Sequence, residues 1–350
     1  MRSGIDLGID EWRAYLTECQ EKPFLAVPIF RWIHAHHVSS FDEMSDVPLR
    51  LREKLKEEFR IDLPKILGKE TAEDETAKYL VEFQDTGTSA ECVLMKYRFG
   101  YSLCISSQAG CRMGCRFCAS TLRGLDRNLT GGEMAGQIYA VEKDAKVSIS
   151  HVVVMGCGEP FDNIQELFRF LNLIHEEEGK NLSLRNITVS TCGLPDQIRI
   201  FTDRDLPVTL AVSLHAPNDT VRKKIMRIAQ AVSMEELMDA CRYYTGKTNR
   251  RITFEYLLID HLNDSRALAE ELCALLSGLL CHVNVIPVNP VKECGFERPK
   301  EERIRQFIEV LEHHHIPVTR RREMGKSIDA ACGQLRHKRQ LQALREDSHA

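Results

Sequence analysis

The chain has 350 residues, of which 43% are apolar and 28% are charged, and its formal net charge is −4. This composition excludes a chain that is disordered throughout, and the mildly acidic balance excludes a polycation that coats nucleic acid everywhere. The thirteen cysteines are an odd number and lack the spacing of a small disulfide-rich secreted protein. No stretch has the pattern of a signal peptide or a membrane span. We therefore expect a cytoplasmic protein whose cysteines are reduced, metal-bound or catalytic.

Residues 1–75 are rich in charge and are predicted to form a small N-terminal helical accessory domain. Within it, Ser40-Phe41-Asp42-Glu43 has the pattern of a capped helix start with Glu43 at the third position. The next segments, 79–83 and 91–97, are predicted to form a β-hairpin across the turn residues Asp85-Thr86-Gly87. We assign residues 76–100 to this hairpin extension.

Beyond residue 100, short apolar strands alternate with helical segments, which indicates an α/β fold with a parallel sheet and crossover helices. The predicted strands are Leu103–Ser106, His151–Met155, Asn186–Ser190, Thr209–Ser213, Ile252–Leu257, His282–Pro287 and Pro317–Arg320. The predicted helices between them include Gly132–Lys143, Gln165–Glu178 and Ser265–Leu276. Catalytic residues are then expected at the carboxyl ends of the strands. We assign residues 101–340 to this core and 341–350 to a tail.

Three cysteines, Cys111, Cys115 and Cys118, form a C-x₃-C-x₂-C motif on the loop that follows a predicted strand. A structural zinc ion usually takes four ligands, and so does an ordinary four-iron cluster. Three cysteines therefore indicate a cluster with one iron open to another ligand, with a zinc site as the alternative. Gly156-Cys157-Gly158-Glu159-Pro160, at the end of strand 151–155, offers a carboxylate that suits the ammonium group of a cofactor.

The cysteine motif, with Phe117 before its last cysteine, resembles that of radical S-adenosylmethionine enzymes, in which the cofactor's amino and carboxylate groups bind the open iron. Over almost the whole chain, further segments resemble the RlmN/Cfr family, which methylates an adenine of large-subunit ribosomal RNA. These segments are Cys104–Cys111, Arg127–Thr130, Met155–Glu159, Ser190–Thr191, Ser213–Asp219, Ile286–Pro290 and Ile328–Leu335. The resemblance implies a partial (β/α)₆ TIM-like barrel, a [4Fe–4S] cluster on the three cysteines and two S-adenosylmethionine molecules per turnover.

The resemblance also implies roles for individual residues. Cys332 would carry the methyl group as S-methylcysteine, Cys104 would release the product through a transient disulfide with Cys332, and Glu91 would accept a proton. Contacts to S-adenosylmethionine would come from Glu159, Pro160, Ser190, Ser213, Leu214, His215 and Asn289. Pro160 favours the branch of the family that methylates C2 of adenine. The C8-specific branch, which confers antibiotic resistance, is the alternative.

Basic residues gather in two windows, 96–128 and 320–340, each with a net charge of +5, and both flank the proposed catalytic cysteines. Because RNA binding depends on contacts to phosphates, we expect these windows to bind 23S ribosomal RNA, and also transfer RNA, with the target adenine unstacked. An electron-donor protein such as flavodoxin or ferredoxin is a further expected partner, and we expect a monomer. A non-catalytic zinc protein that binds RNA, and a radical enzyme that acts on a small metabolite, are the alternatives.

Overall fold

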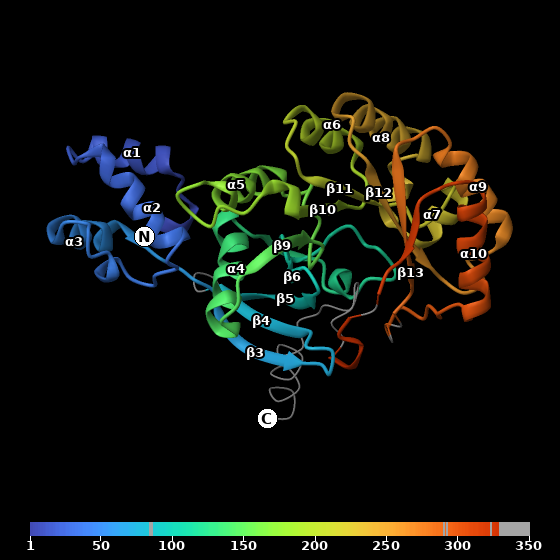
Figure 1. The fold of residues 1–350 in the computed structure, drawn as a ribbon, viewed down its shortest axis with the longest axis horizontal. Helices are drawn as coiled ribbons and strands as arrows, with labels where there is room; N and C mark the ends of the chain where they lie inside the picture. Colours follow the sequence, from blue (N-terminus) through green and yellow to red (C-terminus); the bar gives the residue numbers. More distant parts are fainter. Residues whose placement is uncertain (84–86, 290, 292, 323, 329–350) are drawn as a thin grey trace.

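A computed structural model describes residues 1–83, 87–289, 291, 293–322 and 324–328. Its centre is a ten-stranded sheet in the order β14-β13-β12-β11-β10-β9-β6-β5-β4-β3. The seven strands from β14 to β6 run parallel, whereas β3, β4 and β5 form an antiparallel extension of the sheet. Figure 1 shows helices around the outside of the curved sheet. Because β14 and β3 form opposite ends of the strand order in the described part of the chain, the barrel is partial, as predicted.

The parallel strands and their helices alternate along the chain. The strands are β6 (Gly100–Ile105), β9 (Ile149–Val154), β10 (Ile187–Thr191), β11 (Thr209–Ser213), β12 (Ile252–Leu258), β13 (Cys281–Pro287) and β14 (Val318–Arg320). The helices are α4 (Gly131–Ala145), α5 (Ile164–His175), α6 (Pro195–Asp203), α7 (Asp219–Ile225), α8 (Met234–Thr248), α9 (Arg266–Leu276) and α10 (Glu301–His313). The seven predicted strands and three predicted helices are thus confirmed to within a few residues. Helices cover the sheet, so these strands are apolar along most of their length.

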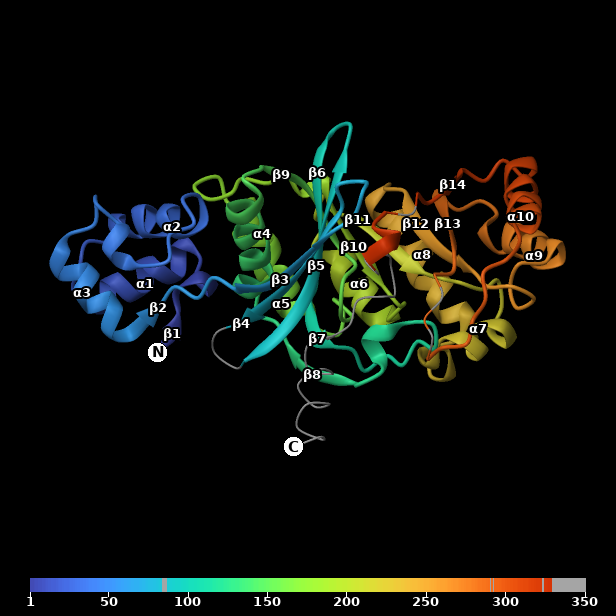
Figure 2. The same cartoon turned by 90° about the horizontal axis from the view of Figure 1, so that it is seen from below.

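The N-terminal part contains the helices α1 (Ile9–Glu18), α2 (Ala26–His34) and α3 (Leu49–Glu58). Figures 1 and 2 show them gathered at one side of the molecule, beside α4. The predicted capped start is confirmed as a short 3₁₀ helix, Phe41–Glu43. The Ser40 hydroxyl accepts a hydrogen bond from Asp42 N at 3.1 Å, and the Glu43 carboxylate accepts one from Ser40 N at 3.0 Å.

The helical prediction for residues 1–75 is wrong at its end, where β3 (Lys65–Thr71) forms the outermost strand of the sheet. Much of β3 is exposed, so its sequence lacks the apolar alternation of a buried strand. Its partner is β4 (Ala77–Phe83), which supplies the hydrogen bonds that stabilise an edge strand. A second, two-stranded pair joins β1 (Arg2–Ser3) to β2 (Phe59–Arg60).

The predicted hairpin is confirmed, since β4 pairs antiparallel with β5 (Thr88–Tyr97). Two of its predicted turn residues, Asp85 and Thr86, lie outside the described residues. None of the helices in the described ranges is long and apolar enough to cross a membrane. The apolar segment 272–288 is divided between α9 and β13, in agreement with the predicted helix that ends at Leu276 and the predicted strand that begins at His282.

A buried histidine, His34, and a partly buried one, His37, lie where the N-terminal helices meet α4. His34 Nδ1 is 2.9 Å from the Tyr139 hydroxyl, and the His37 ring stacks on the Tyr139 ring with 4.1 Å between centroids. Burial lowers the pKa of His34 to about 3 and the pKa of His37 to about 4. Both side chains are therefore neutral in the folded protein at pH 7.

We expect the protein to lose stability as the pH falls from about 7 to 5. In the unfolded chain these histidines take up protons near pH 6.5, whereas in the folded chain they resist protonation until about pH 4 or below. The unfolded state thus binds more protons in this window, and each histidine lowers the free energy of unfolding by about 2 kcal/mol. Urea titrations at pH 7 and pH 5 measure this loss. It should be smaller in His34→Gln and unchanged in His315→Gln, which alters an exposed histidine.

Candidate active site

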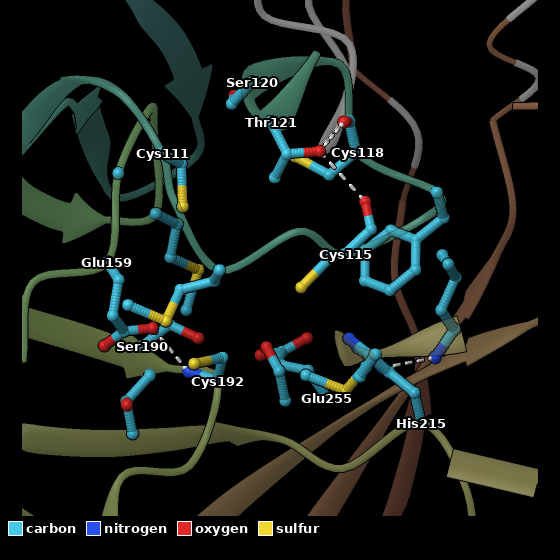
Figure 3. Close-up of a pocket in the computed structure, with 18 of the residues that line it drawn as sticks. Cys111, Cys115, Cys118, Ser120, Thr121, Glu159, Ser190, Cys192, His215 and Glu255 are labelled. Atoms are coloured by element: carbon cyan, nitrogen blue, oxygen red, sulfur yellow. Dashed lines mark hydrogen bonds between the residues drawn. The ribbon is translucent and has the colours of Figure 1, made fainter. Parts of the chain in front are cut away.

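A pocket lies at the carboxyl ends of the parallel strands and encloses about 960 Å³ of space, open solvent at its mouth included. Figure 3 shows the three cysteines of the motif on one side of it and polar side chains from the strand ends on the other. The lining includes Cys111, Cys115, Phe117, Cys118, Ser120, Thr121, Met155, Gly156, Gly158, Glu159, Ser190, Thr191, Cys192, Ser213, His215, Glu255, Leu257, Ile286 and Arg321. The pocket thus lies at the strand ends, where the sequence analysis expects the catalytic residues.

The cysteine loop is held at both ends by a short antiparallel pair that the sequence did not predict, β7 (Gln108–Gly110) and β8 (Leu125–Asn128). Inside the loop, Cys111 N donates to Gly124 O at 2.9 Å, and the Thr121 hydroxyl donates to Cys118 O at 2.9 Å. Arg116 N donates to Ile225 O at 2.9 Å, which fixes the middle of the loop to the end of α7. Main-chain contacts thus determine where the three thiols lie.

The three cysteines can hold a four-iron cluster. No group of three His, Cys, Asp or Glu side chains among the described residues lies close enough together to hold one metal ion. The cysteines of a cluster bind different iron atoms, so their sulfur atoms need not meet at one point. Burial raises the pKa of Cys111 to about 12, and a bound cation would stabilise the thiolate that burial disfavours.

The carboxylate of Glu159 accepts hydrogen bonds from the backbone after β9 and from the backbone after β10. Its Oε1 accepts a hydrogen bond from Phe161 N at 3.0 Å, and its Oε2 accepts one from Cys192 N at 2.6 Å. Burial raises the pKa of this carboxyl group, and the hydrogen bonds from these amides oppose that shift. The carboxylate lines the pocket while it also fixes the backbone of two strand ends.

Gly158 precedes Glu159 in a backbone conformation that suits only glycine. Its φ is +107°, and a Cβ atom there would lie 2.7 Å from Gln108 N. We expect Gly158→Ala to displace this turn, to destabilise the fold by about 2–4 kcal/mol, and to weaken S-adenosylmethionine binding at least tenfold. Chemical denaturation and equilibrium dialysis measure the two effects. Gly246→Ala is the control, because the space around that glycine of α8 is open; equal behaviour of the two variants would contradict the prediction.

His215 follows β11 and is neutral. Its Nδ1 accepts a hydrogen bond from Leu257 N at 3.0 Å, so the proton resides on Nε2. Burial, assisted by the charge of Arg222, lowers its pKa to about 3. Its ring meets the edge of Phe117 with 5.0 Å between centroids. The aromatic residue of the cysteine motif therefore packs the loop against this strand end.

Of the other residues predicted to contact the cofactor, some line the pocket and some do not. Ser190 and Ser213 line the pocket together with Glu159 and His215. Pro160, Leu214 and Asn289 are buried, but they are not among the lining residues.

Glu255 and Arg321 line the pocket. The sequence analysis missed Glu255 and placed Arg321 only in the second basic window, as a residue that binds RNA. The Oε1 atom of Glu255 accepts a hydrogen bond from Asn284 Nδ2 at 3.0 Å, and its Oε2 lies 3.5 Å from Arg321 Nη1. Glu255 is in the middle of the apolar strand β12 and is buried. A charged residue in such a strand is the signal that could have identified it, since unpaired carboxylates are rarely buried.

Cys104 lies on the inner face of β6, in an apolar cluster with Val93, Met95 and Met324. Ile328 and Met155 pack against this cluster, and Met155 also lines the pocket. Glu91 shares the face of β5 that carries Val93 and Met95, because alternate residues of a strand point the same way. Cys332 lies outside the described residues, four positions after Ile328.

In the folded chain, ion pairs with acidic residues neutralise part of the net charge of the first basic window, residues 96–128. At least three of its six basic side chains pair with described acidic residues from outside the window. Lys96 pairs with Glu75 at 2.9 Å, Arg112 with Asp162 at 2.9 Å, and Arg127 with Glu133 at 2.6 Å. Most of the second window, from residue 329 onward, lies outside the described residues.

Comparisons with known proteins agree with this geometry. Residues 5–61 match the ribosomal RNA large subunit methyltransferase N-terminal domain, and residues 105–272 match the radical SAM superfamily. The chain is 48% identical to the "probable dual-specificity RNA methyltransferase RlmN" of Clostridium novyi, over 96% of this chain and 98% of that protein. A protein of the same description from Lachnospira eligens is also 48% identical, with 95% of each chain covered.

A solved structure confirms the predicted fold class. The radical SAM methyltransferase from Sphaerobacter thermophilus is 42% identical to this chain and superimposes with a TM-score of 0.91. The match covers 96% of this chain and 99% of that one, so it includes both the N-terminal helices and the barrel.

Proposed function

The chain belongs to the RlmN family of radical S-adenosylmethionine RNA methyltransferases, and on this premise we propose that it methylates C2 of an adenine in 23S ribosomal RNA and in transfer RNA. The observation that carries the proposal is the pocket in which three cysteines face the polar ends of parallel strands. Such a pocket suits a [4Fe–4S] cluster and S-adenosylmethionine, the cofactors of this family.

When bound, the cluster supplies the electron that cleaves S-adenosylmethionine, a chemistry that avoids the need for a nucleophilic carbon in the base. Cys111, Cys115 and Cys118 would hold the cluster. Glu159, Ser190, Ser213 and the Nε2–H of His215 would orient the cofactor from the opposite wall. Pro160, Leu214 and Asn289 would shape the backbone behind these contacts.

Cys332 would carry the methyl group and form the covalent adduct with RNA. Cys104 would then attack the Cys332 sulfur, so that a disulfide forms and the bond from that sulfur to the methylene carbon breaks. When the adduct forms, the base would give its C2 proton to Glu91 and would also give up one electron. In the release step the electron pair stays with the carbon, which gains a proton and becomes the product's methyl group. An external dithiol, a two-electron reductant, would then reopen the disulfide. The contact of Met324 and Ile328 with the Cys104 cluster supports this, because these residues precede Cys332 in the chain.

The remaining partners follow from the substrate. A folded RNA would contact exposed basic residues near the pocket, and the target adenine would leave its stack to reach the cofactor. We place the enzyme in the cytoplasm as a monomer that receives electrons from a flavodoxin or a ferredoxin.

Mass spectrometry of RNA from a deletion strain tests the proposal. We expect 2-methyladenosine to disappear from ribosomal and transfer RNA and to return when the gene is restored. Loss of 8-methyladenosine with 2-methyladenosine intact would instead support the C8 alternative. Anaerobic purification tests the cofactor, since a colourless protein that contains zinc and no iron would reject the radical mechanism.

A further inference from the structure

Arg222 is a fully buried charge behind the wall of the pocket. It lies on α7, and its side chain is 0% exposed. Its Nη2 donates a hydrogen bond to Cys192 O at 2.7 Å, and its Nε donates to Leu214 O at 3.3 Å. The guanidinium therefore ties the loop after β10 to the end of β11 through neutral carbonyl acceptors.

This guanidinium has no carboxylate in contact within the described part of the chain. Its Nη1 atom is buried and makes no hydrogen bond with any described residue. Cys192, whose carbonyl oxygen accepts the hydrogen bond from Arg222, packs in one apolar cluster with Cys115 and lines the pocket with it. Burial lowers the pKa of Arg222. Guanidinium groups nevertheless stay protonated in proteins. An unpaired buried cation is costly by several kcal/mol, so a nearby anion is expected.

We propose that Arg222 is a positioning residue whose charge balances the iron–sulfur cluster on Cys111, Cys115 and Cys118 and makes that cluster easier to reduce. This inference rests on the proposed function, because it requires the cluster. Three thiolates on a [4Fe–4S]²⁺ core give a net charge of about −1, and one electron from an external donor changes it to about −2. A fixed positive charge in a medium of low dielectric constant stabilises the reduced cluster more than the oxidised cluster, because the reduced cluster is more negative. The charge therefore raises the reduction potential.

Three variants separate the charge of Arg222 from its hydrogen bonds. Arg222→Gln removes the charge. Arg222→Lys keeps the charge but lacks the planar array of N–H donors of a guanidinium group. Arg227→Gln is the matched control. Arg227 is exposed, and a Cβ atom on Gly114 of the cysteine loop would lie 3.0 Å from its Cδ. It is thus near the loop, but water screens its charge.

Redox titration of the reconstituted cluster, followed by electron paramagnetic resonance without S-adenosylmethionine, tests the inference at equal iron content. At a given potential we expect the ratio of reduced to oxidised cluster to be at least tenfold lower in Arg222→Gln, which corresponds to about 59 mV for one electron. Arg222→Lys should stay within threefold of the wild type, and Arg227→Gln should not differ from it.

An unchanged reduction potential in Arg222→Gln would overturn the inference. Equal shifts of the potential in Arg222→Gln and Arg222→Lys would also overturn it, because the lost hydrogen bonds would then explain the shift in each variant. If Arg222→Gln does not fold, Arg222→Met, which is neutral and fills similar space, replaces it under the same criteria. A wild-type protein that binds no iron would reject the proposed function itself, whereas normal iron content with no shift rejects only the role of Arg222.

Discussion

A Cys104→Ala variant is expected to stop after it has formed a covalent bond to its RNA. In the proposed reaction the Cys104 sulfur is the group that attacks Cys332 and so breaks the bond between enzyme and product. Without it the adduct persists, and multiple turnover should fall by roughly three orders of magnitude or more, the scale seen when a covalent nucleophile is removed. Denaturing gels and mass spectrometry of the protein after nuclease digestion detect the adduct.

Two other cysteine variants provide the controls. Cys332→Ala should form neither product nor adduct, because it removes the site of the methyl group. Cys92→Ala should turn over normally, because Cys92 is also buried, on β5, but packs in the main core and outside the cluster of Cys104. Normal turnover by Cys104→Ala, or an adduct in Cys92→Ala, would show that Cys104 does not release the product.

The second large effect is expected for Glu159→Gln. The carboxylate accepts hydrogen bonds from two backbone N–H groups, and an amide can offer only one oxygen to them. One buried N–H would then face an NH₂ group, at a cost of about 2–4 kcal/mol in the free energy of unfolding. The displaced strand ends should also weaken S-adenosylmethionine binding at least tenfold. Urea titration and anaerobic equilibrium dialysis measure these quantities.

Glu142→Gln is the control that separates the loss of stability in Glu159→Gln from its weaker binding of S-adenosylmethionine. Glu142 is also a buried glutamate, and it accepts a hydrogen bond from Ile149 N at 2.6 Å, but it is not among the residues that line the pocket. We expect it to lose comparable stability while it binds S-adenosylmethionine normally. If both variants bind the cofactor equally well, Glu159 has only a structural role.

The sequence predicted the elements whose patterns are local and strong. Strands such as β9 and β11 are short apolar segments between helices, and Ser40 with Glu43 forms a capping pattern that requires only four residues. It did not predict β3, which is mostly exposed and depends on pairing with β4. The β7–β8 pair was also missed, because it joins segments separated by the whole cysteine loop.

The sequence by itself determined the resemblance to the family and the seven parallel strands. It also predicted that three cysteines belong to one site, because their spacing of four and three residues places them on one short loop. Only the tertiary structure decided how buried charges are matched. Glu255 on β12 faces Arg321, which follows β14, and Arg222 donates hydrogen bonds to carbonyl groups at two strand ends. It also decided that Glu75, Glu133 and Asp162 offset part of the first basic window. The physical reason is that electrostatic interactions depend on distance and burial, which chain order does not encode.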